Sequence, residues 1–84
     1  MKLVFAEQAW KDCLWWQRQD KKVVKRINEL IEATAPEPFA GIGKPEPLRH
    51  ALASWWSRRI TDEQRMVYKP ERDALWIAQL RYHY

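Results

Sequence analysis

The chain has 84 residues, of which 46% are hydrophobic, and 15 lysines and arginines against 11 acids give a formal net charge of +4. A chain of this length forms one small core, which excludes a nucleotide-binding α/β domain joined to a second module. The hydrophobic share excludes a disordered tail, so we expect one domain spanning residues 1–84.

The first elements are expected to be a strand and a helix. Residues 2–5 form a short apolar run typical of a strand. A helical stretch opens at Glu7, and its apolar residues Trp10, Cys13 and Leu14 recur at the spacing of one helix face. We expect Cys13 to lie in the core.

A second helix is expected to begin after Asp20, whose side chain can cap its N-terminus. Its apolar face gathers five aliphatic residues: Val23, Val24, Ile27, Leu30 and Ile31. Residues 35–47 then contain four prolines and two glycines, a composition typical of a loop with restricted backbone angles.

Three strand-like runs follow this loop. Residues 55–61 and 65–68 flank the turn residues Asp62 and Glu63, as in a hairpin. A second turn is expected within residues 70–73.

Residues 74–84 are expected to form a long last strand, buried at Trp76-Ile77-Ala78 and reaching the C-terminus. The order of elements predicts an α+β fold, in which two N-terminal helices pack on one face of a mostly antiparallel sheet.

Positive charge is concentrated in the C-terminal half. Residues 1–40 carry seven bases and six acids, whereas residues 41–84 carry eight bases, six of them arginine, and five acids. Because the guanidinium fork suits phosphate, a nucleic acid is the expected partner, and a solvated basic surface is the alternative.

Cysteine and histidine usage bounds the compartment and the cofactors. A single cysteine cannot form an internal disulfide, which fits a reducing cytosol. With two widely spaced histidines there is no zinc pattern, and we expect neither a metal nor another cofactor. The N-terminal apolar run is too short for a signal peptide or a membrane span, so we expect a soluble cytoplasmic protein.

Two titratable residues could carry acid–base chemistry. Glu46 stands between two prolines, which stiffen the backbone and present its carboxylate in a fixed direction, as a general base needs. His83 could act as a general acid near neutral pH. The alternatives are a charged residue in a surface loop and a lone surface histidine.

Arg59 and Arg65 lie on opposite strands of the expected hairpin. They share a sheet face if the loop between them holds three or five residues, and face opposite sides if it holds two. On one face they could stabilise a pentacovalent phosphate. A base, an acid and arginines are together what metal-free RNA cleavage needs, although two cations on a solvated face are the alternative.

Four segments stand out as motifs: the loop GxGKPEPL at 41–48, WSRRIT at 56–61, R-x-VY at 65–68 and the tail RYHY at 81–84. Together they resemble the YoeB toxin family of the RelE superfamily. The resemblance runs over essentially the whole chain and implies a RelE-like microbial ribonuclease fold.

The resemblance implies roles for individual residues. Glu46 becomes the general base and His83 the general acid, with Arg59, Arg65 and Tyr84 completing the catalytic set. It also implies RNA contacts at Lys44 and Arg49, where arginine replaces a lysine frequent in the family. Arginine keeps the charge but changes the geometry of that contact.

The resemblance further implies a toxin that cleaves mRNA in the ribosomal A site and inhibits translation, forms a homodimer and is neutralised by a YefM-like antitoxin. Neighbouring strand residues point to opposite faces, so His83 and Tyr84 cannot both face one site in a regular strand. We therefore expect the last residue or two to leave the sheet.

Two other functions are compatible with the basic composition. A non-catalytic RNA- or ribosome-binding module would use arginine and tryptophan but would not need Glu46 or His83. A DNA-binding regulator ranks last, because no helix carries an evident base-reading set. We expect the six tryptophans to form core and dimer interface rather than a base-stacking platform.

Overall fold

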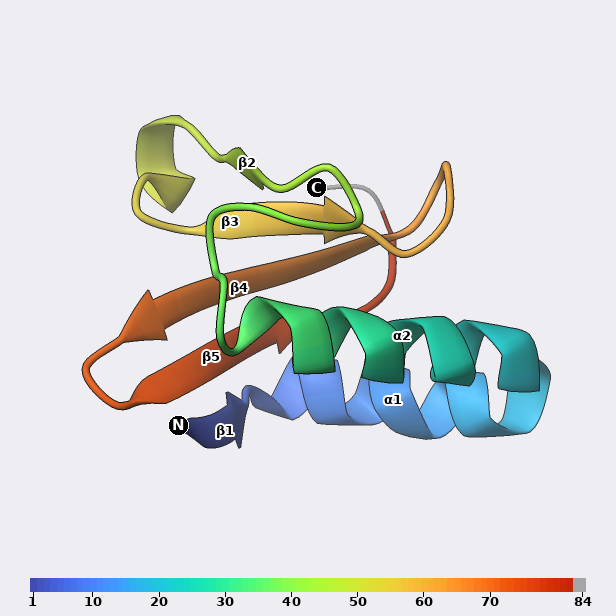
Figure 1. The fold of residues 1–84 in the computed structure, drawn as a ribbon. Coiled ribbons are helices and arrows are strands. Elements are labelled where there is room, and N and C mark those ends of the chain that lie inside the picture. The colour runs from blue at the N-terminus through green and yellow to red at the C-terminus, as the bar shows by residue number, and fades with distance from the viewer. Residues whose placement is uncertain (83–84) are drawn as a thin grey trace.

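The computed structural model describes residues 1–82 and shows two helices against one face of a five-stranded sheet (Figure 1). The elements in chain order are β1 (Lys2–Phe5), α1 (Glu7–Gln19), α2 (Lys21–Thr34), β2 (Glu46–Pro47), a 3-10 turn (His50–Leu52), β3 (Trp56–Arg59), β4 (Arg65–Glu71) and β5 (Ala74–Gln79). The strand order is β1-β5-β4-β3-β2, with β1 parallel to β5 and every other pair antiparallel. The predicted α+β fold is confirmed.

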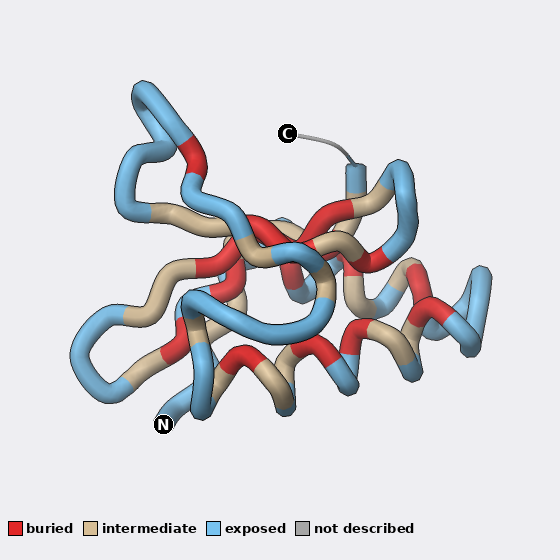
Figure 2. Tube along the Cα trace, turned by 45° about the horizontal axis from the view of Figure 1, so that its top comes forward, coloured by how far each residue is buried: buried red, intermediate tan, exposed pale blue. Residues whose placement is uncertain are grey.

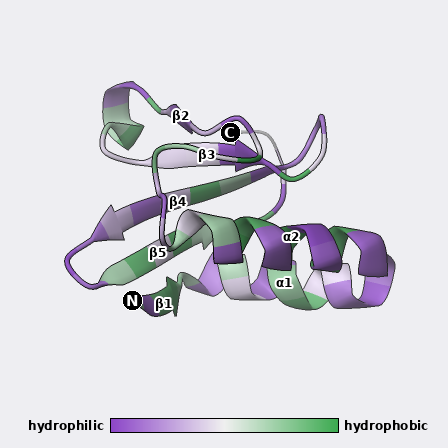
Figure 3. Cartoon of the chain, viewed as in Figure 1, coloured by the Kyte–Doolittle hydropathy of each residue, from purple (hydrophilic) through white to green (hydrophobic). Residues whose placement is uncertain are grey.

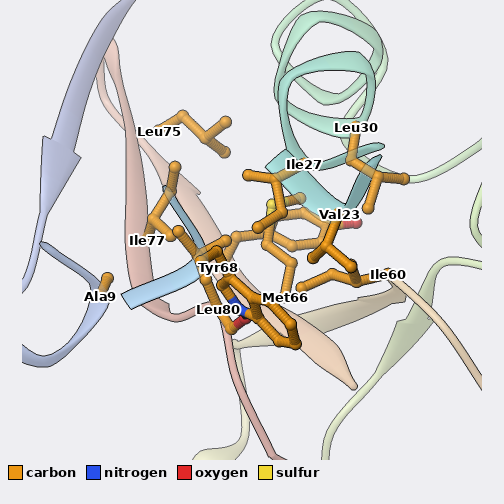
Figure 4. Close-up of a cluster of buried hydrophobic side chains, with 11 residues drawn as sticks. Ala9, Val23, Ile27, Leu30, Ile60, Met66, Tyr68, Leu75, Ile77 and Leu80 are labelled. Carbon is orange, nitrogen blue, oxygen red and sulfur yellow. The ribbon is translucent and has the colours of Figure 1, made fainter. Parts of the chain in front are cut away.

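Helix α2 begins and packs as its sequence predicts. The Asp20 carboxylate accepts hydrogen bonds from the amides of Lys22 and Val23, so it caps the helix. Val23, Ile27 and Leu30 are buried on the apolar face. In Figure 4 they extend from the helix toward the sheet residues Met66 and Tyr68 of β4 and Ile77 of β5.

Helix α1 buries a different face from the one that its apolar residues predict. Trp10 is 51% exposed and Leu14 is 38% exposed, whereas Ala9, Asp12 and Trp16 are buried. The predicted apolar stripe is therefore wrong, although Cys13 does pack against the core. A charged residue on the buried face conceals the helical pattern, because periodicity counts only apolar residues.

The buried Asp12 and Trp16 fasten the chain that follows β5 to α1. Asp12 Oδ2 accepts the Leu80 amide at 3.0 Å, and Trp16 Nε1 donates to the Leu80 carbonyl at 2.8 Å. Asp12 Oδ1 also accepts the Gln8 side-chain amide at 2.8 Å. Both polar groups of the Leu80 backbone are thus bonded to side chains of α1 rather than to a neighbouring strand.

Replacing Asp12 by alanine is expected to lower the free energy of unfolding by about 1–3 kcal/mol, because the buried Leu80 amide loses its acceptor. Urea denaturation should show a lower midpoint with an unchanged slope. Asp12→Asn keeps an acceptor oxygen and should recover most of the loss. Gln8→Ala removes only the exposed partner and should be nearly neutral. An Asp12→Ala protein as stable as wild type would contradict this account.

The last strand is shorter than predicted. Strand β5 ends at Gln79, so residues 80–82 leave the ladder, and the expectation of a strand reaching the C-terminus is wrong. Pairing jumps from Tyr68↔Ile77 to Val67↔Gln79, which leaves Ala78 as a bulge. The extra residue shifts the side-chain alternation, so that Leu80 rather than Gln79 enters the core.

The hairpin also differs in detail from its prediction. Strand β3 ends at Arg59 rather than at residue 61, and β4 continues through Pro70 to Glu71. The connection between Arg59 and Arg65 therefore holds residues 60–64, and the two arginines pair directly. Hydrophobic residues occupy the middle of β4 and hydrophilic residues its two ends (Figure 3).

Tryptophan contributes less to the core than predicted. Of the six, only Trp16 is buried, and Trp10 and Trp76 are 51% and 40% exposed. Trp76 lies on β5 beside the buried Leu75 and Ile77, so the expected burial of Trp76 is wrong. The alternation of a strand with one covered face places Trp76 opposite the helices.

Within residues 1–82, neither helix combines the length and apolarity that crossing a membrane requires.

Candidate functional site

Strand register brings three of the candidate residues onto one face of the sheet. Glu46 of β2 pairs with Ser57 of β3, and Arg59, two residues further along β3, pairs with Arg65 of β4. Paired residues share a face, and residues two apart along a strand also share a face. Tyr68 and Arg58 belong to the opposite, helix-covered face. Glu46, Arg59 and Arg65 therefore lie on the sheet face opposite the helices, the open face, although Arg65 itself is buried there.

The same register sets the spacing of these side chains. Directly paired residues have Cβ atoms about 4.5–5.5 Å apart, and diagonal neighbours about 7–8 Å. Arg59 and Arg65 are a direct pair, whereas Glu46 and Arg59 are diagonal neighbours across β2 and β3.

Arg65 is held by the connection that precedes it. It is 6% exposed, and its NH1 donates to the carbonyls of Thr61 at 2.9 Å, Asp62 at 2.8 Å and Gln64 at 3.2 Å. The five-residue connection thus folds back on the guanidinium and fixes it. A cation fixed in this way loses little conformational entropy on binding an anion.

Arg59 presents a buried donor. Its Nε is buried and donates no hydrogen bond to any group of residues 1–82. Its backbone is fixed on both sides, because the amide donates to the Gly43 carbonyl at 2.6 Å and the carbonyl accepts from Arg26 at 3.4 Å. A buried donor without an acceptor is unfavourable.

Glu46 and Arg49 line one hollow, of about 490 Å³, together with His50. Lys44 lines a second one of about 290 Å³ beside Arg59. The two residues expected to contact RNA therefore lie at different hollows. His50, four residues after Glu46, was not among the predicted site residues. In Figure 2 most of the chain between α2 and β3, which contains Lys44, Glu46, Arg49 and His50, is exposed.

The loop before β2 is attached to the sheet by Arg58, which sequence analysis also missed. Arg58 is fully buried, and within residues 1–82 its guanidinium donates to the carbonyls of Ile42 at 3.1 Å, Ala40 at 2.8 Å and Glu37. Its Nε donates to the Tyr68 hydroxyl at 3.2 Å. Strand alternation, which places Arg58 and Arg59 on opposite faces, was the available signal.

Tyr68 is the second attachment of this loop. Its hydroxyl donates to the Pro38 carbonyl at 2.6 Å while it accepts from Arg58. Burial raises the pKa of this phenol, and the hydrogen bond and charge of Arg58 oppose that rise. The neutral hydroxyl, which can both donate and accept, is therefore the form present near neutral pH.

The two glycines of the loop make room for this arrangement. Gly43 has a φ of +82°, and a Cβ added there would lie 2.8 Å from Leu30 Cδ2 and 3.1 Å from Arg58 Cβ. Gly41 has a φ of +119°, and its Cβ would lie 3.3 Å from Arg58 NH1. Side chains at these positions would be strained and would push the loop away from Arg58.

His83 and Tyr84, predicted as the acid and its neighbour, lie outside the described residues. The segment before them is held on two sides. The Tyr82 amide donates to the Gln64 side chain, and the Tyr82 carbonyl accepts the Arg65 amide at 3.1 Å. The Arg81 guanidinium stacks 3.4 Å from the ring centroid of Trp15 on α1.

Metal chemistry has no evident ligand set in this part of the chain. Residues 1–82 contain no cluster of three or more histidine, cysteine or acidic side chains that could hold a metal ion.

Comparisons with known proteins agree on one group. Residues 5–84 match the family of YoeB-like toxins of bacterial type II toxin–antitoxin systems. The chain is 57% identical to the toxin YoeB of Escherichia coli K12 over 84 residues, covering 100% of both chains.

Solved structures give the same result. The chain resembles a YoeB/ParE toxin from Agrobacterium tumefaciens with a TM-score of 0.97 and 48% identity, covering 100% of each chain. It also resembles the YoeB dimer from Staphylococcus aureus, with a TM-score of 0.93, and the toxin in the heterotetrameric YoeB–YefM complex from that organism, with a TM-score of 0.92. Both are 41% identical and cover 100% of this chain and 98% of the other. These likenesses confirm the fold expected from the sequence.

Proposed function

Because the chain belongs to the family of YoeB-like toxins of bacterial type II toxin–antitoxin systems, we propose that it is an endoribonuclease that cuts messenger RNA in the ribosomal A site and so inhibits translation. The observation that carries the proposal is the register that places Glu46, Arg59 and Arg65 on the open face of the sheet. These are the residue types that cleavage at a 2′-hydroxyl requires without a metal ion.

The proposed reaction is a transfer within the RNA backbone. The Glu46 carboxylate takes the proton of the 2′-hydroxyl, and the 2′-oxygen attacks the adjacent phosphorus. Arg59 and Arg65 neutralise the charge that develops on the non-bridging oxygens. The bond from phosphorus to the 5′-oxygen breaks, and His83 donates a proton to that leaving oxygen. The products are a 2′,3′-cyclic phosphate and a 5′-hydroxyl.

Three further residues complete the proposed site. Tyr84 orients His83 or the substrate, and Lys44 and Arg49 contact the RNA backbone from the two hollows they line. Because these hollows flank the β2 segment, the two cations can bind phosphates on either side of the cleaved one. Phosphate contacts of this kind position RNA and carry no base specificity.

We further propose that the chain acts as a single domain in the cytoplasm, forms a homodimer and is neutralised by a YefM-like antitoxin. The solved YoeB dimer and YoeB–YefM complex support the dimer and the antitoxin partner, since the chain matches the toxin in both over its full length.

The test is expression of the protein alone in a bacterium. Growth should stop, and primer extension should reveal cuts in translated messages. With purified components, cutting should be much faster with ribosomes than without. The isolated protein at high concentration on naked RNA should retain its residual activity in a chelator. Normal growth with intact transcripts at confirmed expression would contradict the proposal.

The rival function from another class is a non-catalytic RNA- or ribosome-binding module. Such a module could also stop growth, by occupying the ribosome, but it would leave messages uncut. The basic and aromatic residues suit either function. They include Lys69, whose Nζ lies 4.9 Å from the ring centroid of Trp55. Cut messages therefore separate the two.

A further inference from the structure

The segment that carries Glu46 has few backbone groups with which to join the sheet. Pro45 and Pro47 lack an amide hydrogen on both sides of Glu46, and β2 pairs with β3 over only two residues. A two-residue edge strand is too short to fix its own register. Other contacts must therefore determine where Glu46 lies relative to β3.

Side chains on the helix-covered face of β3 and β4 supply these contacts. Residues 37–42 form an irregular loop, and their carbonyls converge on Arg58 and on the Tyr68 hydroxyl. The Arg58 guanidinium is planar, so the carbonyls bonded to its NH1 (Ile42) and NH2 (Glu37 and Ala40) must adopt one fixed arrangement. Immediately after this loop, the Gly43 carbonyl accepts the Arg59 amide.

This use of arginine is not what packing alone would favour. Arg58 is fully buried, and no carboxylate of residues 1–82 pairs with its charge. Burying a cation without a counter-ion is unfavourable, and an apolar side chain of similar volume would fill the same space at less cost. A role of Arg58 in holding residues 37–42 in position would explain why an arginine is buried here.

We propose that Arg58 and Tyr68 are positioning residues for the Glu46 carboxylate. They hold residues 37–42 against the helix-covered face of β3. This fixes the register in which the following segment joins β3, with Glu46 paired with Ser57. The carboxylate then stands on the same face as Arg59 and Arg65. The inference rests on the proposed function for the role of Glu46 alone.

The first test compares cleavage by two conservative variants. Arg58→Lys keeps the charge but loses the planar guanidinium that holds the carbonyls and the Tyr68 hydroxyl in one arrangement, and Tyr68→Phe removes only the hydroxyl. Displacement of a reacting group by about 1 Å can reduce a rate about a hundredfold. We expect kcat on programmed ribosomes to fall about ten- to a hundredfold for Arg58→Lys and less for Tyr68→Phe, with KM nearly unchanged.

A matched control separates positioning from general loss of stability. Ile27→Val removes one methyl group from the core and none of the hydrogen bonds of Arg58 or Tyr68. Assayed well below every melting temperature, it should cut at the wild-type rate. If Arg58→Lys and Tyr68→Phe behave like this control, the proposal is overturned.

A second measurement does not depend on cleavage. The Leu48 amide donates to the Trp55 carbonyl at 2.9 Å, directly after β2. In both variants its hydrogen exchange should become faster, while the amides of α1 and α2 exchange as in wild type. Unchanged exchange at Leu48 would overturn the positioning role. If the wild-type protein cuts no RNA but the Leu48 amide still exchanges faster in the variants, the positioning role is supported. The absence of cleavage then contradicts only the proposed function.

Discussion

Replacing Glu46 by glutamine is expected to reduce mRNA cleavage on ribosomes by about a hundred- to ten-thousandfold, the usual contribution of a general base or acid. Glutamine has nearly the same shape and leaves both flanking prolines and the pairing with Ser57 in place. It cannot accept the 2′-hydroxyl proton, however. The loss should therefore appear in the rate constant of the cleavage step, while ribosome binding is retained.

The measurement is single-turnover cleavage with excess protein, together with co-sedimentation with ribosomes as the binding assay. Glu37→Gln is the matched control, because it makes the same chemical change in the same loop at a residue that contributes only its carbonyl to Arg58. That variant should cut normally. A Glu46→Gln protein that binds and cuts like wild type would show that another group is the base.

Replacing His83 by alanine is expected to have an effect of the same order, because the 5′-oxygen would leave without a proton donor. Stability should change little, since the described anchors of this end of the chain are the backbone of Leu80 and of Tyr82 and the stacked Arg81. Circular dichroism and thermal melting check the fold, and binding to a purified YefM-like antitoxin checks the surface.

The other histidine provides the comparison for this experiment. His50 lines the same hollow as Glu46, so it is the one further imidazole that could protonate a leaving group there. His50→Ala should retain most of the activity. If His50→Ala loses cleavage and His83→Ala keeps it, the assignment of the acid is wrong and moves to His50.

Local sequence signals predicted the elements that depend on local interactions. The Asp20 cap and the aliphatic stripe of α2 are present as expected, because a cap and a 3.6-residue period act within a few residues of the chain. The strand at residues 2–5 is present for the same reason, and so is the proline-rich loop, except that its last two predicted residues form β2. The family resemblance supplied the candidate roles of Glu46, Arg65 and His83.

Signals from the sequence failed where a distant segment decides the burial. Nothing in α1 indicates that Asp12 faces inward, since its partner is the Leu80 amide 68 residues later. Nor does the apolar run after residue 73 indicate that Ala78 forms a bulge, because a bulge is defined by the neighbouring strand.

The sequence by itself thus determined which residues could carry acid, base and phosphate chemistry, and where both helices and most of the strands lie. Only the tertiary structure decided that Arg59 and Arg65 pair across β3 and β4 with Glu46 beside them, and that Arg58 turns inward to hold the loop. The physical reason is that side-chain direction in a sheet alternates residue by residue, so the length of a connection and the register of pairing determine which face each residue occupies.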